Sequence, residues 1–265
     1  IHNSANKLFS LSRVAPVGLI IYANASLMSV PVEIIVKEYK KQLADRSFQK
    51  LEDYVNDFIA YIESNNELFR LNLNEEDYVT SVFKDLMYGL LCDNKNMVCS
   101  QIDNLKRPLT DEEAKATFET ACKQTLTFVD SIPKRADNNF SDYVKKNYLP
   151  HFIQLLLDDS SFKWIAKDLV QELCEKSCEI FDTDFYRSGY VGIAVAGYGN
   201  SEIYPNMIHM HISGYLNRKL RYCIRETVSI QEDNTASVVP LAQTDVMQTF
   251  LFGINDRFLS DLSQQ

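Results

Sequence analysis

Glycine is scarce in this chain, and its distribution divides the sequence. The 265 residues include eight glycines, five of which fall between Gly189 and Gly214. From Ser47 to Thr183 the chain is almost free of glycine, and apolar residues recur there at the three- and four-residue spacing of amphipathic helices. This scarcity predicts an all-helical segment followed by a change of architecture.

Several enzyme signatures are absent. The chain contains no Gly-rich phosphate loop, no Gly-x-Ser-x-Gly elbow and no His-Glu-x-x-His run, so the enzyme classes that depend on those motifs lose support. No apolar run approaches the roughly 18 residues of a membrane helix, and the N-terminus lacks the residue order of a secretory signal. We therefore expect a soluble, cytoplasmic protein without a membrane partner.

Positive charge is in deficit as well. With 27 Lys and Arg against 36 Asp and Glu, the net charge is −9, which argues against nucleic acid as a partner.

The six cysteines are unevenly spaced, so free thiols are favoured over disulfides. Cys174 and Cys178 share one helical face, but no further ligand is signalled nearby, so buried thiols are favoured over a zinc site. Neither a cofactor nor a metal is predicted.

The predicted helical segment has recognisable boundaries. Thr110 followed by Glu113 forms a capping box that begins one helix, and Pro133 ends it. Ser141 opens the next, which Pro150 is expected to kink or split. Five apolar stripes are predicted between Ser47 and Thr183, within 54–62, 78–90, 114–129, 144–156 and 162–180.

Strand patterns flank this helical segment on both sides. Before it, 6–12 and 17–23 predict two strands with a bend at Pro16 and Gly18, and Pro31 opens an amphipathic helix. After it, 191–196, 203–212 and 219–230 predict three strands, with a bend at Gly214 and Asn217. A last helix is expected from Gln243, with Thr244 as a plausible N-cap.

The first strands resemble a known family. The triplet Lys7-Leu8-Phe9, the apolar strand Gly18 to Ala23 and the helix that ends at Leu43 are similar to proteasome β subunits and the HslV peptidase, which are N-terminal nucleophile (Ntn) hydrolases. The order of elements from Val191 to Gly253 is similar to the later part of that family. The resemblance implies an α+β protein with an Ntn-hydrolase-like antiparallel β sandwich flanked by helices. Its parts would be 1–46, a helical insertion at 47–183, and 184–265.

The same resemblance implies a set of site residues. In the family, an N-terminal Thr, Ser or Cys attacks an amide carbonyl, a nearby lysine assists, and a backbone N–H binds the oxyanion. By position, Lys7 matches the lysine and Ala23 matches the oxyanion residue, where the family generally has Gly. Gln243 and Thr244 stand where the family has a supporting Gly-Ser-Gly turn. The nucleophile is expected before Ile1, and without the resemblance Lys7 would be interpreted as a solvated strand-end lysine.

Three functions remain open at this point. The first is hydrolysis of a peptide or amide substrate. The second is a non-catalytic proteasome-like scaffold that self-associates into a homo-oligomer and binds a protein partner at the helical insertion. The third is a purely helical interaction protein. His209 and His211 point to one strand face because they are two residues apart, which suits a metal or acid–base pair, but we expect exposed surface histidines.

Overall fold

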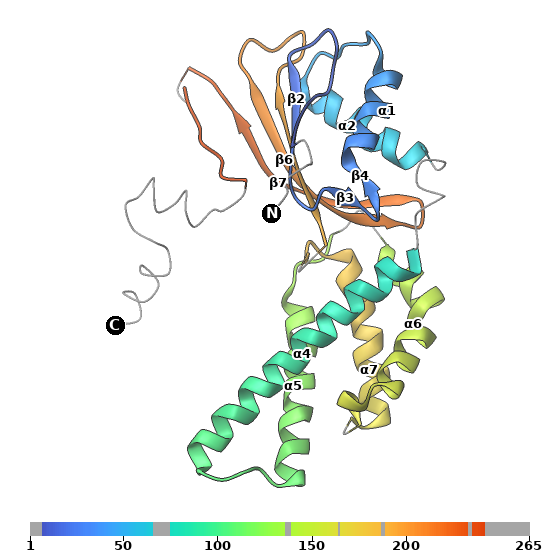
Figure 1. Cartoon of the computed structure of the whole chain (residues 1–265), viewed down its shortest axis with the longest axis vertical. Coiled ribbons are helices and arrows are strands. Elements are labelled where there is room, and N and C mark those ends of the chain that lie inside the picture. Colours follow the sequence, from blue (N-terminus) through green and yellow to red (C-terminus); the bar gives the residue numbers. More distant parts are fainter. Residues whose placement is uncertain are drawn as a thin grey trace. The chain divides into compact units, whose positions relative to one another are not determined.

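The computed structural model describes residues 7–65, 75–135, 139–163, 165–186, 189–232 and 235–241. These residues form an α+β protein with six α-helices and a five-stranded antiparallel sheet (Figure 1). The chain divides into two compact units. We call 1–73, 189–214 and 218–265 the sheet unit, and 74–188 with 215–217 the helical unit. The expectation of a purely helical protein is therefore wrong.

The sheet is assembled from segments at both ends of the chain. Its strands are β1 (Leu8–Ser10), β2 (Val17–Ala23), β5 (Val191–Gly197), β6 (Asn206–Leu216) and β7 (Lys219–Ser229), in the order β1-β2-β5-β6-β7. Two-residue strands β3 (Ser26–Leu27) and β4 (Val30–Pro31) form a separate ribbon. In the described part of the chain this is the only other sheet, so the second layer of a sandwich is not seen there.

One face of the sheet is covered by α1 (Val32–Leu43) and α2 (Leu51–Ser64), which pack beside it in Figure 1. The helices cover this face because alternate residues of β2 and β5 point to it, and those residues are aliphatic and buried. Helix α1 begins after Pro31, and its buried residues are those of the predicted stripe: Val32, Ile35, Val36, Tyr39 and Leu43. The sequence pattern is therefore confirmed for this helix.

Helix α2 belongs to the sheet unit, although the sequence boundary at 47 assigned it to the helical insertion. Its Phe58 ring packs 5.0 Å from the ring of Tyr39 on α1, and the Tyr39 hydroxyl donates a 2.9 Å hydrogen bond to Asp57. The turn after β5 contacts the first residue of α2: the carboxylate of Glu202 accepts a 2.8 Å hydrogen bond from the backbone N–H of Leu51. A buried apolar stripe looks alike whichever core it joins, so periodicity alone does not place such a helix.

The helical unit contains α4 (Glu75–Leu105), α5 (Asp111–Ser131), α6 (Phe140–Asp158) and α7 (Lys167–Cys178), with short 3-10 helices at Ser160–Phe162 and Glu179–Asp182. The rings of Phe83 and Phe152 stack in its core at 4.1 Å and 3°. The capping box predicted at Thr110 and Glu113 is present. Helix α6 continues through Pro150 as one element, so the predicted split does not occur.

Two buried or partly buried carboxylates organise the ends of these helices. Asp182 accepts hydrogen bonds from the backbone N–H groups of Phe140 and Ser141 at 2.7 and 3.1 Å, which satisfies donors that an α-helix leaves open at its start. Glu75 accepts from the hydroxyls of Tyr143 and Tyr148 at 2.7 and 2.8 Å. In the described residues no helix is long and apolar enough to cross a membrane.

Candidate functional site

Lys7 and Ala23 lie at the same end of neighbouring strands. The register pairs Leu8 with Ile20, and the backbone N–H of Ile21 donates to the carbonyl of Lys7 at 2.8 Å. Ala23 is the last residue of β2, and both Lys7 and Ala23 are exposed. The antiparallel pairing of β1 with β2 thus brings together the two residues that the sequence resemblance singled out in this part of the chain.

Ala23 has a backbone conformation that suits glycine better. Its φ angle is 59°, in the left-handed region, where an L-residue with a Cβ atom costs roughly 1–2 kcal/mol. The resemblance described above implies that Ala23 stands at a position where Ntn hydrolases generally have Gly. A left-handed backbone at that position is what a glycine accommodates without strain.

A second group of polar side chains lies on the sheet face opposite the aliphatic one. The register places Tyr22 of β2 beside Gly192 of β5, and Gly192 beside His211 of β6. Since Gly192 has no side chain, the Tyr22 ring lies directly over it: an added Cβ would meet the ring at 2.1 Å. The tyrosine thereby spans β5 and reaches the histidines of β6.

Three side-chain atoms converge at this point. The hydroxyl of Tyr22 hydrogen-bonds to Nε2 of His209 and, at 2.6 Å, to Nε2 of His211. The ring of Tyr190 stacks on that of His211 with 4.1 Å between centroids, which fixes the imidazole orientation. We call Tyr22, His209, His211 and Tyr190 the tyrosine–histidine cluster.

The environment of this cluster favours neutral side chains. Burial raises the pKa of the Tyr22 hydroxyl well above its usual value, with the neighbouring Tyr190 adding to the effect and Arg225 opposing it. Burial lowers the pKa of His211 to about 4, assisted by His209 and Arg225. Burial likewise lowers the pKa of His209. At neutral pH both imidazoles are therefore uncharged, each with one N–H group and one unprotonated nitrogen.

We expected His209 and His211 to be exposed surface residues. That expectation is wrong for His209, whose exposed fraction is 8%, and His211 is half-buried. Their placement on one face, which the two-residue spacing predicted, is confirmed by the contacts with Tyr22. Tyr22 was missed because it lay within an apolar run. The available signal was Gly192, since a glycine in a strand interior often marks a place where another group approaches closely.

Gln243 and Thr244, the remaining residues of the sequence-based site, lie outside the described residues. Cys174 and Cys178 are buried free thiols, as predicted, and burial raises the pKa of each to about 12. Among the described residues, no three His, Cys, Asp or Glu side chains are grouped so that they could hold a metal ion.

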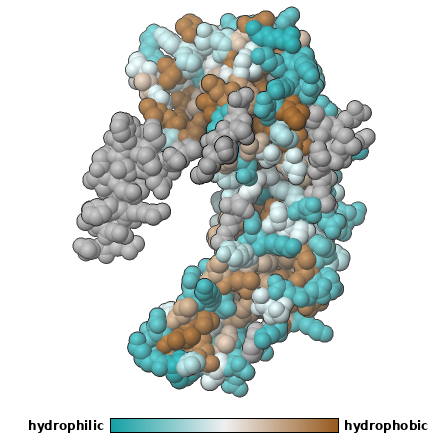
Figure 2. Space-filling model, viewed as in Figure 1, coloured by the Kyte–Doolittle hydropathy of each residue, from teal (hydrophilic) through white to brown (hydrophobic). Residues whose placement is uncertain are grey.

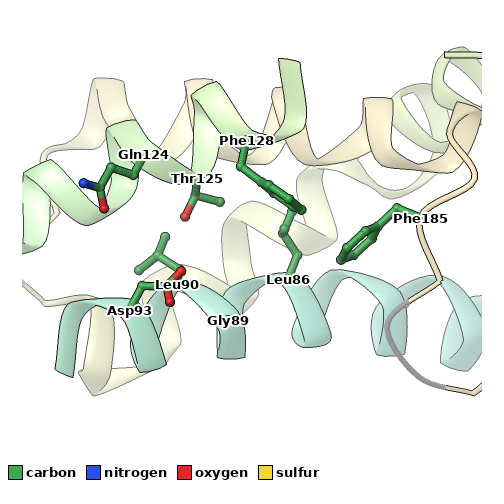
Figure 3. Close-up of a pocket in the computed structure, with 8 residues that line it drawn as sticks. All are labelled: Leu86, Gly89, Leu90, Asp93, Gln124, Thr125, Phe128 and Phe185. Atoms are coloured by element: carbon green, nitrogen blue, oxygen red, sulfur yellow. The ribbon is translucent and has the colours of Figure 1, made fainter. Parts of the chain in front are cut away.

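The helical unit contains a pocket of about 420 Å³ between α4 and α5 (Figure 3). One end is apolar, with Leu86 and the rings of Phe128 and Phe185, which pack edge to face at 5.4 Å. Asp93 and Gln124 give the other end polar groups. The lining contains no nucleophile paired with a base, so the pocket offers a binding volume rather than catalytic groups.

Comparison with known proteins identifies no relative of this chain: no protein-family model, no curated protein and no solved structure matches it.

Proposed function

We propose that this chain is a diverged Ntn-hydrolase-like protein, related in fold to proteasome β subunits and HslV, that hydrolyses peptide or other amide bonds. The supporting observation is the arrangement of Lys7 and Ala23 at the same end of two paired strands, followed by helix α1. The finer fold in this proposal is an antiparallel sandwich, in which a second sheet would stack on the face that carries the tyrosine–histidine cluster.

In the proposed reaction, the N-terminal Thr, Ser or Cys of a processed chain attacks the amide carbonyl, and its own α-amine accepts the proton. The ammonium of Lys7 would favour the deprotonated nucleophile by its positive charge. The backbone N–H of Ala23 would donate to the oxyanion, and its left-handed φ of 59° sets the direction of that peptide group. Gln243 and Thr244, which stand where the family has its supporting turn, would support the nucleophile.

The test uses the full-length protein as isolated from its native source. Intact-mass spectrometry after treatment with a peptide epoxyketone, an electrophile that traps N-terminal nucleophiles, is expected to show one adduct on a terminal Thr, Ser or Cys. Lys7→Ala is expected to slow labelling at least about 100-fold, the usual scale for acid–base assistance. Lys40→Ala is the matched control, because its exposed ammonium donates a single 3.1 Å hydrogen bond to Ser10. An unprocessed initiator Met with no adduct would refute the hydrolase.

The second candidate is a non-catalytic scaffold, and the methyl group of Ala23 favours it. That Cβ stands where a glycine would leave room for a carbonyl to approach the oxyanion site. The helical unit would supply the surface for a protein partner, since Tyr88, Leu105, Phe128 and Leu157 are exposed there. Brown patches interrupt the teal surface in Figure 2.

A scaffold of this kind is expected to self-associate, as its proposed relatives do. Size-exclusion chromatography with light scattering is expected to give a homo-oligomer, and a monomer at all accessible concentrations would remove the assembly from the proposal. The two candidates separate cleanly, because the scaffold assembles without reacting with the epoxyketone.

A further inference from the structure

We propose that Tyr22, His209 and His211 form a binding site for a divalent first-row transition-metal ion, with Cu²⁺ or Zn²⁺ as the suited class. Two imidazole nitrogens and one phenol oxygen converge on a single point of the sheet face. Imidazole and oxygen ligands of this kind suit Zn²⁺ and Cu²⁺. The ligands differ from Lys7, Ala23 and the expected nucleophile, so the metal titration and the epoxyketone test can fail separately.

The backbone gives this convergence its rigidity. Tyr22 and His211 lie on strands that are both paired with β5, in register with the same residue, Gly192. His209 projects from the same face of β6, two residues away. All three ligands thus come from the interior of one sheet rather than from loops, which holds their directions more closely.

The Tyr22 oxygen lies closer to both imidazole nitrogens than it would around a bound ion. Bonds of 2.0–2.1 Å to a tetrahedral ion place ligand atoms about 3.3 Å apart. Oη of Tyr22 and Nε2 of His211 are 2.6 Å apart, and Oη lies closer still to Nε2 of His209, so both contacts must open by roughly 0.7–1 Å to admit the ion. On binding, the Tyr22 hydroxyl would release its proton to solvent, and the phenolate oxygen would bond to the metal.

Neighbouring groups refine the expectation. Tyr190 stacks on His211 and fixes the ring that carries Nε2. The positive charge of Arg225 interacts electrostatically with Tyr22, His209 and His211, and the negative charge of Glu226 interacts with His209. The guanidinium of Arg225 opposes a cation at this position, so its removal is expected to tighten metal binding.

The competing explanation is a hydrogen-bonded hub without a metal. The Tyr22 hydroxyl would donate to one imidazole and accept an N–H from the other, which satisfies all three groups. The two explanations differ in a measurable way, because only the first gives stoichiometric metal binding that depends on all three side chains.

The experiment titrates the full chain, stripped with EDTA, with Cu²⁺ and separately with Zn²⁺. We expect one equivalent of either ion to bind, and the copper form to show a visible phenolate-to-copper charge-transfer band. His209→Gln with His211→Gln is expected to weaken binding by at least 100-fold. Tyr22→Phe removes only one oxygen and is expected to abolish the band, while Arg225→Gln strengthens binding several-fold.

A histidine of the helical unit provides a matched control. The ring of His151 contacts Thr80 at 3.1 Å, and His151→Gln is expected to leave the binding constant and the band unchanged. Circular dichroism melts establish that each variant folds. Absence of stoichiometric binding in the unmodified chain overturns the proposal, as does an unchanged charge-transfer band in folded Tyr22→Phe.

Discussion

Because the Tyr22 ring lies directly against Gly192, adding a side chain at Gly192 should destabilise the protein. An ideal Cβ at Gly192 would lie 2.1 Å from Cζ of Tyr22 and 2.3 and 2.5 Å from Cε1 and Cε2. Carbon atoms in contact are about 3.5–4.0 Å apart. In Gly192→Ala the ring must therefore rise by roughly 1.5 Å, and its hydroxyl moves out of the 2.6 Å contact with His211.

The cost follows from two contributions. Overpacking a well-filled site costs about 1–3 kcal/mol, and a lost hydrogen bond costs about 0.5–1.5 kcal/mol. Gly192→Ala should therefore lower the free energy of unfolding by about 1.5–4.5 kcal/mol. In a Tyr22→Ala background the ring is gone, and the same substitution should raise it by about 0.5–1 kcal/mol, because alanine loses less backbone freedom than glycine in a strand.

Urea unfolding of the four proteins in this cycle measures the coupling directly. Gly18→Ala is the matched control. Gly18 lies on β2, on the same sheet face as Tyr22, and its added Cβ would have only ordinary contacts, at 3.6 and 4.0 Å. It should be neutral or slightly stabilising. An equal loss of stability from Gly192→Ala in both backgrounds would refute the reasoning.

Further outcomes are expected elsewhere in the chain. Phe152→Ala should cost about 3–5 kcal/mol in thermal or urea unfolding, because it empties half of the stacked pair in the helical core. Exposed Cys99 should react with a thiol reagent in the native protein, whereas buried Cys174 should react only on unfolding. Arg107 holds the pKa of Glu113 down at about 2. Since this folded-state pKa lies below the unfolded one, the contribution to stability is present above about pH 4.5 and is lost as the pH falls toward 2. Carboxyl-carbon NMR should show the Glu113 pKa rising in Arg107→Gln, and an unchanged value would contradict this pairing.

The sequence predicted correctly those features that depend only on residues close together in the chain. The stripe of α1, the limits of β2 and the capping box at Thr110 all depend on residues within one or two turns of each other, and all three are confirmed. Strand β6 begins three residues later than the predicted 203–212 and ends four residues later, because Gly214 lies within it. The turn to β7 uses Asn217 and Arg218, both with positive φ. A glycine can serve as either a bend or a strand residue, and the sequence does not distinguish the two.

The tyrosine–histidine cluster could be predicted only in part. The spacing of His209 and His211 placed them on one face, but the third member comes from a position 187 residues away from His209. Its approach depends on the order β2-β5-β6 and on the register that aligns Tyr22 with Gly192. Neither the order of strands nor their register is written in any local pattern, because both are set by the packing of distant segments.

The position of β5 in the sheet has a consequence for how the protein is made. A ribosome delivers the N-terminal strands β1 and β2 first, yet the partner that β2 needs is synthesised only after the helical unit. Until then β2 carries an unpaired edge, and closing so long a loop is slow unless the intervening helices have already condensed. Conditions that delay those helices should therefore leave an aliphatic strand open to wrong partners, and aggregation of nascent chains should begin at the front of the protein.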